Sequence, residues 1–418
     1  MVYFLKKYLL LICFGVLWPF ATNAEKLIGV IFSQNVAEQN VIAVSKESKD
    51  FFLVKIVDDM PEVVQHIEKI KLGENGGDKE KKGDKKTPSG IYYVQSFIPD
   101  DKLPEIYGFG AFPLNYPNIV DRIYNKTGYG IWIHGIGNDP KLNTEGCIAL
   151  DNKYIKTFKS KNITGLPVII TENVPFYKRG EYEQYKWGLI NYLKQYHDLW
   201  QLNDYNNFKN FYHQEFRAGG SQTLKNYLSQ KSKLMKLYPY KRILYDNVKI
   251  YRENDSEVLF DYNQLYCADN ILSEGAKKLY LIREDNSFKI IAEEFTNSKE
   301  YSLTKAYILK YIRAWRNAWQ NKNIDEYMKF YHKDFTGDGF NYNRWYDDKK
   351  DKFAKLRFIK VDISGITVKF IKPTLYRITF IQKFESDKYS DSGIKTIMLS
   401  GCISDNKIIS EIWRPLKR

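Results

Sequence analysis

Between Val41 and Thr171 the hydrophobic positions form short runs or alternate with polar ones, as they do in β-strands. The stretch NVIAVSKESKDFFLVKI contains two such runs around a polar turn at Lys46–Lys49, which predicts a strand pair. GIYYV, YGIWIHG and GLPVIIT are further apolar runs bounded by turn-forming residues. The pattern predicts a mainly-β domain, which we place at residues 25–175.

After Glu181 the spacing of hydrophobic residues becomes helical. Leu189, Leu193, Tyr196 and Trp200 fall on one face of a helix. Alternating segments that are typical of strands follow this helical region. Helices followed by several strands predict an α+β domain, with the helices packed on a curved antiparallel sheet.

The same sequence pattern occurs a second time in the C-terminal part of the chain. Trp319 lies 119 positions after Trp200, and the later segment FYHKDF repeats FYHQEF at the same interval. We expect the interval to continue without a gap, so that Tyr346 corresponds to Tyr227. The sequence therefore predicts two tandem α+β domains, at 181–296 and 302–418, that arose by duplication of a whole domain rather than as a short solenoid repeat.

The first residues have the pattern of a cleavable secretory signal. Lys6 and Lys7 precede an apolar run that ends near Phe20, and small residues lead to Ala24. An uncleaved membrane anchor is the alternative, but the run is short for a span and Pro19 interrupts it. We expect residues 1–24 to be a signal peptide, export to the periplasm or cell envelope, and membrane contact only through this transient segment.

Composition and charge narrow the class of partner. A hydrophobic fraction of 44% indicates a globular protein, and a net charge of +14 suits a polyanionic surrounding such as a cell envelope or nucleic acid. Export and the lack of a nucleic-acid-binding motif argue against nucleic acid. The charged run GDKEKKGDKK (77–86) mixes both signs, which predicts a solvated loop.

Three cysteines remain after removal of the signal segment. Cys267 and Cys402 either form a disulfide or are both buried as small apolar residues, and their separation favours neither alternative. Cys147 is then the free thiol.

Cys147 and His134 are the candidate catalytic pair. A cysteine thiol has a pKa of about 8.5 and needs a base, which an imidazole supplies. His134 ends the apolar strand YGIWI, and the intervening segment is rich in turn formers that can bring Cys147 beside it. The main-chain amides at Gly146 and Cys147 are candidates for an oxyanion hole. The spacing of the two residues alone would favour a buried structural thiol. Whether they are catalytic therefore depends on the surrounding sequence.

Five further residues near this pair are candidates for lining a substrate cleft: Tyr116, Asn118, Trp132, Thr144 and Ala149. The histidines are too scattered to predict a metal site, and neither a serine-nucleophile elbow nor a phosphate-binding loop is present in the sequence. We expect no metal and no cofactor.

The segments around the pair resemble the L,D-transpeptidase catalytic domain, also called the YkuD type. The resemblance rests on His134-Gly135, on Thr144-Glu145-Gly146-Cys147-Ile148 and on the upstream KTPSGIYYV. The family usually has arginine two positions after the cysteine, where this chain has Ala149. Together with FPLNYPN, this difference resembles the hydrolytic branch, the L,D-carboxypeptidases that trim peptidoglycan and set helical cell shape. The C-terminal domains resemble the nuclear-transport-factor-2-like (NTF2-like) fold, which also follows the catalytic domain in that branch.

The resemblance implies a mechanism on peptidoglycan stem peptides. Cys147 attacks the carbonyl before the terminal D-alanine, His134 transfers the proton, and a main-chain carbonyl such as that of Gly135 orients the imidazole. Water then resolves the thioester. Transfer to an amine by an L,D-transpeptidase, hydrolytic release of a peptidoglycan-linked protein, and a non-catalytic envelope-binding scaffold are the alternatives. Peptidoglycan is the expected partner, with envelope proteins or a second copy of the chain as further possibilities for the two C-terminal domains.

Overall fold

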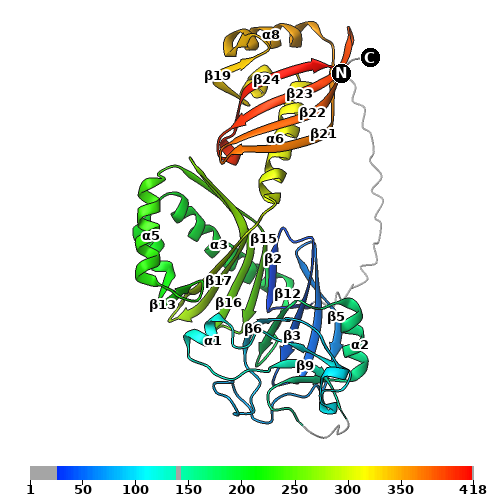
Figure 1. Cartoon of the computed structure of the whole chain (residues 1–418), viewed down its shortest axis with the longest axis vertical. Helices are drawn as coiled ribbons and strands as arrows, with labels where there is room; N and C mark the ends of the chain where they lie inside the picture. The colour runs from blue at the N-terminus through cyan, green and yellow to red at the C-terminus, as the bar shows by residue number, and fades with distance from the viewer. Residues whose placement is uncertain (1–25, 138–142, 417–418) are drawn as a thin grey trace, which may run out of the picture.

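The computed structural model describes residues 26–137 and 143–416, so the expected signal segment 1–24 lies outside the described residues. The molecule is elongated, with the catalytic region at one end, the first α+β domain in the middle and the second at the other end (Figure 1). No helix in the described part of the chain has the length and apolarity needed to cross a membrane.

The catalytic region is built from two sheets. The first has the order β5-β4-β3-β11-β6 and the second the order β10-β9-β8-β7. Side chains from the two facing sheets, including Phe51, Tyr92, Phe112 and Ile133, form one apolar core. The elements of this region are β3 (Glu38–Ser45), β4 (Asp50–Val57), β5 (Met60–Ile67), β6 (Gly90–Tyr93), β7 (Ile98–Pro99), β8 (Gly110–Pro113), α1 (Ile119–Ile123), β9 (Trp132–Gly135), β10 (Ile148–Leu150), α2 (Asn152–Lys161) and β11 (Pro167–Thr171). The predicted strand pair with a turn at 46–49 is β3 and β4.

The first α+β domain consists of helices against a long sheet that is antiparallel except for the parallel pair β13 and β18 (Figure 1). Leu193, Tyr196 and Trp200 on α3 are buried in its core, as the helical spacing predicts. Its elements are α3 (Arg179–Gln201), α4 (Tyr205–Phe208), β13 (Tyr212–Ala218), β14 (Gln222–Thr223), α5 (Leu224–Leu237), β15 (Lys241–Glu253), β16 (Glu257–Ala268), β17 (Ile271–Glu284) and β18 (Ser287–Asn297).

The N-terminal strands join the catalytic region to this domain. β1 (Lys26–Ile28) pairs with β12 (Phe176–Lys178), and β2 (Ile31–Gln34) pairs antiparallel with β15, so β2 is the seventh strand of the sheet of the first α+β domain. We expected the whole of 25–175 to form the catalytic domain, whereas the strands at 26–34 pair outside it. The other face of the five-stranded sheet packs on the same domain through residues such as Val41, Val54, Leu259 and Tyr280. Burial on both faces explains the near-continuous apolar runs of β3 and β4.

The second α+β domain repeats the first. Its elements are α6 (Ser302–Gln320), α7 (Ile324–Met328), β19 (Tyr331–Gly337), β20 (Phe340–Asn341), α8 (Tyr342–Lys355), β21 (Ile359–Lys372), β22 (Leu375–Ser386), β23 (Ser390–Ser400) and β24 (Lys407–Pro415).

The interval between the two copies changes within the repeat. β19 begins 119 positions after β13, but α8 begins 118 positions after α5, so the turn after β19 is one residue shorter. Buried Trp345 therefore occupies the position of buried Tyr227. The expected gapless match of Tyr227 with Tyr346 is wrong, because Tyr346 lies one position further around the helix.

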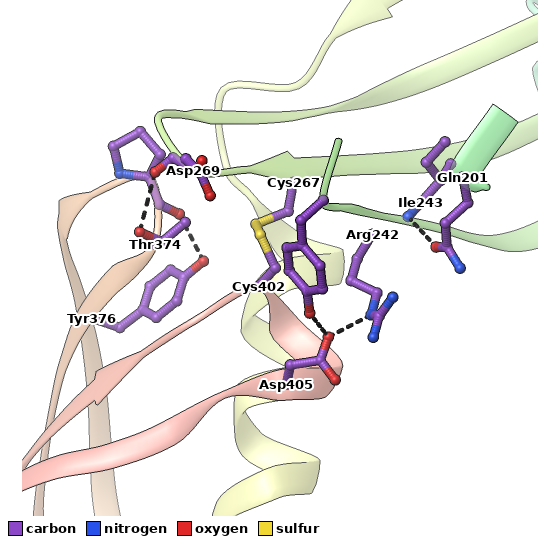
Figure 2. Close-up of a disulfide and its surroundings, with 11 residues drawn as sticks. Gln201, Arg242, Ile243, Cys267, Asp269, Thr374, Tyr376, Cys402 and Asp405 are labelled. Carbon is purple, nitrogen blue, oxygen red and sulfur yellow. Dashed lines mark hydrogen bonds and ion pairs between the residues drawn. A yellow bond between two sulfur atoms is a disulfide. The ribbon is translucent and has the colours of Figure 1, made fainter. Parts of the chain in front are cut away.

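A disulfide joins the two α+β domains. Cys267 and Cys402 are bonded across 135 residues of chain, which decides between the two alternatives left open by the sequence. Figure 2 shows Asp405 beside this bond, with Arg242 of the first domain donating to its carboxylate. Tyr240 of the same domain donates to this carboxylate as well. Glu274 of the first domain accepts hydrogen bonds from the N-terminal amides of α6 at Leu303 and Thr304, at 2.6 and 2.9 Å. The linkage between the domains is thus covalent and polar as well as apolar.

Candidate active site

The register of two strands places the candidate nucleophile beside the candidate base. β9 and β10 are parallel, and Ala149 is the partner of His134. Cys147 directly precedes β10. Because side chains two positions apart in an extended chain lie on one face, Cys147 and Ala149 lie on the same side as His134. The parallel pairing thereby brings together two residues that are thirteen positions apart in the sequence.

His134 is held by the main chain of the next residue. Its imidazole is 6% exposed, and Nδ1 donates to the carbonyl oxygen of Gly135 at 2.7 Å. This contact, expected from the sequence, fixes the tautomer that leaves the lone pair on Nε2. Burial lowers the pKa of His134, against the opposing effect of the Gly135 hydrogen bond. The imidazole is therefore neutral at neutral pH and can act as a base.

The Cys147 thiol is protonated in this structure. Sγ donates to the carbonyl oxygen of Gly130 at 3.2 Å. Burial raises the pKa of the thiol to about 11, while a hydrogen bond from the Trp132 main chain and the charge of Lys79 lower it. The resting pair is thus a neutral thiol, bonded to Gly130, and a neutral imidazole. Catalytic hydrogen bonds commonly tighten only in the substrate complex.

Tyr107 contacts both His134 and Trp132 in the site, and the sequence analysis did not identify it. It lies in a short 3-10 helix, Glu105–Tyr107, and its ring meets the rings of His134 and Trp132 with centroids 5.0 and 4.9 Å away. Burial raises the pKa of Tyr107. It lies between KTPSGIYYV and FPLNYPN, outside the segments that carry the resemblance, so no local pattern marked it.

Thr144 and Gly146 shape the turn that carries the nucleophile. Thr144 Oγ1 donates to the carbonyl of Cys147 at 2.6 Å and accepts from the Gly146 amide at 3.1 Å. Gly146 has φ +133°, and a Cβ there would lie 2.7 Å from the carbonyl oxygen of Lys86, so glycine is required. The Gly146 amide is engaged by Thr144 and does not fit the expected oxyanion role. The amide of Cys147 itself remains the candidate donor.

The charged segment 77–86 is more than a solvated loop. Lys79 and Asp84 form an ion pair of 2.6 Å whose side chains are only 4% and 8% exposed. Burial would raise the pKa of Asp84, but hydrogen bonds from Lys79 and from nearby main-chain amides lower it. The other lysines of the run are more exposed, so the prediction of a solvated loop is correct for them and wrong for this pair. The buried pair places a positive charge near Cys147.

Tyr116 and Asn118 are buried at the start of α1. The Tyr116 hydroxyl donates to the carbonyl of Thr127 at 3.2 Å, and Asn118 caps α1 by accepting from the amides of Val120 and Asp121. Both side chains are at most 5% exposed. Their hydrogen bonds account for both residues, and we assign them no substrate contact.

Ala149 and Trp132 lie closer to the candidate catalytic pair. Trp132 is half-buried and packs on Tyr107. Ala149 is buried and lines a cavity of about 590 Å³, together with residues such as Lys69, Ile136 and Tyr154. A cavity of this size is within the range that holds small ligands. Among residues 26–137 and 143–416, no three potential metal ligands come together.

Comparisons with known proteins agree with this geometry. Residues 39–170 match the L,D-transpeptidase catalytic domain, and residues 188–294 and 307–412 match the Cds6 C-terminal NTF2-like domain. The chain belongs to the proteins with Cds6 C-terminal NTF2-like domains, two of which follow an L,D-transpeptidase catalytic domain. The expected fold, a mainly-β catalytic domain followed by two tandem α+β domains, is confirmed. Among curated proteins, no sequence matches this chain.

Solved structures show the same architecture over about two thirds of the chain. Bd1075 of Bdellovibrio bacteriovorus is 26% identical with a TM-score of 0.59, and the match covers 66% of this chain and 100% of that one. A point mutant of the helical cell shape determining protein Pgp2 from Campylobacter jejuni is 25% identical with a TM-score of 0.53, covering 63% and 93%. The family, with these neighbours, indicates a cysteine-dependent enzyme that acts on peptidoglycan peptides.

Proposed function

We propose that this protein is an exported L,D-carboxypeptidase that removes the terminal D-alanine from tetrapeptide stems of peptidoglycan. The observation that carries the proposal is the juxtaposition of Cys147 with His134 in a family site that has Ala149 where arginine is usual. The similar protein Pgp2 is a helical cell shape determining protein, which agrees with a peptidoglycan-trimming role.

The first half of the reaction forms a thioester. His134 Nε2 takes the proton of Cys147 as Sγ attacks the carbonyl carbon before the terminal D-alanine. The oxyanion of the tetrahedral intermediate accepts from the Cys147 amide. The intermediate collapses by breaking the C–N bond, and His134 returns its proton to the leaving amine. The product of this half is free D-alanine and an acyl group on Cys147.

The second half releases the tripeptide. Water attacks the thioester carbonyl, His134 accepts its proton, and the C–S bond breaks so that the thiolate regains the proton. Gly135 acts through His134 by fixing the tautomer, and Tyr107 by packing on the imidazole. Both are positioning residues.

The proposal of hydrolysis rests on Ala149. An arginine in this position would lie beside His134 and would fill part of the adjoining cavity with a fixed cation. Alanine removes that cation and leaves space for water. A disulfide between Cys267 and Cys402 supports export, because such bonds persist in oxidising compartments.

The test is digestion of purified disaccharide tetrapeptide in water enriched in ¹⁸O, followed by mass spectrometry. We expect disaccharide tripeptide carrying one ¹⁸O atom, and free D-alanine. Cys147→Ala should form neither product. The double variant Cys267→Ser/Cys402→Ser is the matched control, because it removes cysteines outside the site and should keep the activity.

Three outcomes would overturn the proposal in different directions. Cross-linked dimers in place of tripeptide would indicate an L,D-transpeptidase. Tripeptide formation that survives in Cys147→Ala would exclude the thioester. An inert wild-type chain, with stem-linked protein also unprocessed, would favour an envelope-binding scaffold.

A further inference from the structure

A lysine completes a row of side chains that runs across the candidate active site. Lys71 and Ala149 form an antiparallel bridge, in which each main-chain amide donates to the carbonyl of the other residue, at 3.0 and 2.9 Å. Ala149 is in turn the parallel partner of His134. Lys71, Ala149 and His134 therefore lie side by side on three neighbouring segments of the chain. Lys71 has no role in the two half-reactions described above.

The alternation of side chains places Lys71 on the same face as the catalytic pair. Five of the residues next to the row in sequence are buried in the core of the catalytic region: Ile70, Leu72, Ile133, Ile148 and Leu150. Successive side chains of an extended chain point to opposite faces. Lys71, Ala149 and His134 therefore all point away from that core. Lys71 is half-buried, so its ammonium group is accessible to a ligand.

The small side chain of Ala149 allows Lys71 to reach toward His134. Directly opposite side chains in a sheet have Cβ atoms about 5 Å apart, so Lys71 and His134 are about two such steps from each other. The flexible four-carbon stem of lysine spans much of one step, and the methyl group of Ala149 does not obstruct it. An arginine at position 149 would occupy this space.

The proposed substrate brings a negative charge to the same place. A tetrapeptide stem ends in the free carboxylate of D-alanine, one residue beyond the carbonyl that Cys147 attacks. Ala149 follows Cys147 by two positions on the same face of the chain. A stem that runs from Cys147 toward Ala149 therefore places its terminal carboxylate level with Ala149. The antiparallel partner of Ala149 at that level is Lys71.

Other charges near β10 have partners or roles of their own. The carboxylate of Glu145 lies 3.7 Å from the ammonium of Lys85, and that of Asp151 lies 3.8 Å from the ammonium of Lys153. Burial raises the pKa of Cys147, and the lysine whose charge opposes this effect is Lys79. These contacts favour a role for Lys71 in binding substrate rather than in activating the thiol.

We propose that Lys71 binds the terminal carboxylate of the stem peptide and makes the enzyme select stems that end in a free carboxylate. The inference deepens the proposed function and rests on it, because this carboxylate belongs to the leaving D-alanine. The cation comes from the neighbouring segment of chain instead of from position 149. Lysine is a point charge on a flexible stem, whereas arginine holds a carboxylate in a rigid fork. Lys71 can therefore release D-alanine and leave space for water at the thioester.

The first test is ligand binding to the full chain carrying Cys147→Ala, which cannot form a thioester. Calorimetric titration compares disaccharide tetrapeptide with the same compound amidated at its terminal carboxyl group. We expect the free acid to bind at least about tenfold more tightly, because amidation removes the charge that the ammonium group recognises. Adding Lys71→Met should abolish this preference by weakening the binding of the free acid only. Lys71→Arg keeps a cation and should retain most of the preference.

The second test is turnover by the chain with Cys147 intact. Lys71→Met should raise KM for disaccharide tetrapeptide by about tenfold and leave kcat nearly unchanged, because the carboxylate is held equally in the ground state and the transition state. The matched control is Lys55→Met, which removes a lysine of β4 that is paired with Glu38 at 3.0 Å. This variant should leave KM and the preference for the free acid unchanged.

Three results would each overturn the inference: equal binding of the acid and the amide to Cys147→Ala, a preference that survives in folded Lys71→Met, or a loss of preference in Lys55→Met. Thermal melts show whether each variant is folded. The comparison of the two ligands on Cys147→Ala needs no variant at position 71, so the inference can fail even if Lys71→Met does not fold. A preference for the free acid without any tripeptide formation would overturn the proposed function alone.

Discussion

The two NTF2-like domains contain the same buried anchor but differ in what surrounds it. In the first, Glu293 binds Lys277 at 2.5 Å and accepts from Tyr227 at 2.7 Å. In the second, Glu411 binds Lys395 at 2.9 Å and accepts from Tyr331 at 2.6 Å. The anchor stabilises the shared scaffold, and duplication has left it in place.

The rest of the surroundings has diverged. Trp345 stands where the first domain has Tyr227, and Trp413 stands where it has Phe295. The first domain is built into the catalytic region through β2, which covers the edge of β15, whereas the corresponding strand β21 is the last strand of its sheet. The comparison shows that the first copy shares its sheet with an N-terminal strand, whereas the sheet of the second copy is formed by its own strands alone.

The largest expected effects test the shared anchor. Glu293→Gln and Glu411→Gln each leave a buried lysine without its carboxylate, which costs about 3–5 kcal/mol of unfolding free energy. Amide hydrogen exchange, followed separately in β15 and in β21, measures the unfolding free energy of each domain. Similar losses, each confined to its own domain, are expected. A large loss in one domain and none in the other would break the comparison.

The next prediction tests the sheet that β2 shares with the first NTF2-like domain. A substitution in β2 should lower the stability of this domain by a similar amount and leave the second domain unchanged. Phe32 is fully buried in β2 and stacks on Tyr182 with centroids 4.8 Å apart. Phe32→Ala should cost about 3–5 kcal/mol in the first domain, because it leaves a cavity. The second domain should be unaffected. Val57→Ala, at a side chain that is 39% exposed, is the control and should change stability by less than about 0.5 kcal/mol. Equal loss of protection in both domains would contradict independent attachment.

The disulfide is the next test, because it is the covalent link between the copies. Cys267→Ser/Cys402→Ser should cost about 2–4 kcal/mol by releasing a loop of 135 residues in the unfolded chain. Small-angle scattering of the folded variant should show a wider range of angles between the two domains. If denaturation and scattering are both unchanged, the polar contacts at Asp405 and Glu274 suffice to hold the domains.

The smallest expected effect is a pH dependence that differs between the copies. Burial lowers the pKa of Lys231 to about 7 and that of Lys349 to about 8, from an ordinary value of 10.5. Between the folded pKa and 10.5 the unfolded chain binds the proton and the folded chain does not, so folding is favoured as pH rises through this window. The gain should begin at a lower pH in the first domain, because the pKa of Lys231 is lowered further than that of Lys349.

Denaturation between pH 6.5 and 10 measures this gain, and Lys231→Met and Lys349→Met serve as the controls. Each substitution should flatten the curve of its own domain only. A stability that falls over the window in both domains would contradict the lowered values.

Much of the fold followed from the sequence because it depends on local patterns. The strand pair β3–β4, the buried face of α3 and the duplication are set by spacing along the chain. The position of Tyr346 was misassigned because a one-residue change in a turn leaves no trace in the helical pattern that follows. The pairing of the strands at 26–34 with β12 and β15 was not predicted, because pairing partners far apart in the chain are not encoded in either strand alone.

The candidate site also has features that followed from the sequence and features that depended on the tertiary structure. The sequence by itself determined which residues can do chemistry, since Cys147 and His134 lie in segments that resemble a known catalytic domain. Only the tertiary structure decided that the Gly146 amide is occupied by Thr144, that Lys79 is buried, and that Tyr107 packs on the imidazole. These facts depend on burial and on hydrogen-bond geometry between distant segments, and such properties exist only once the chain has folded.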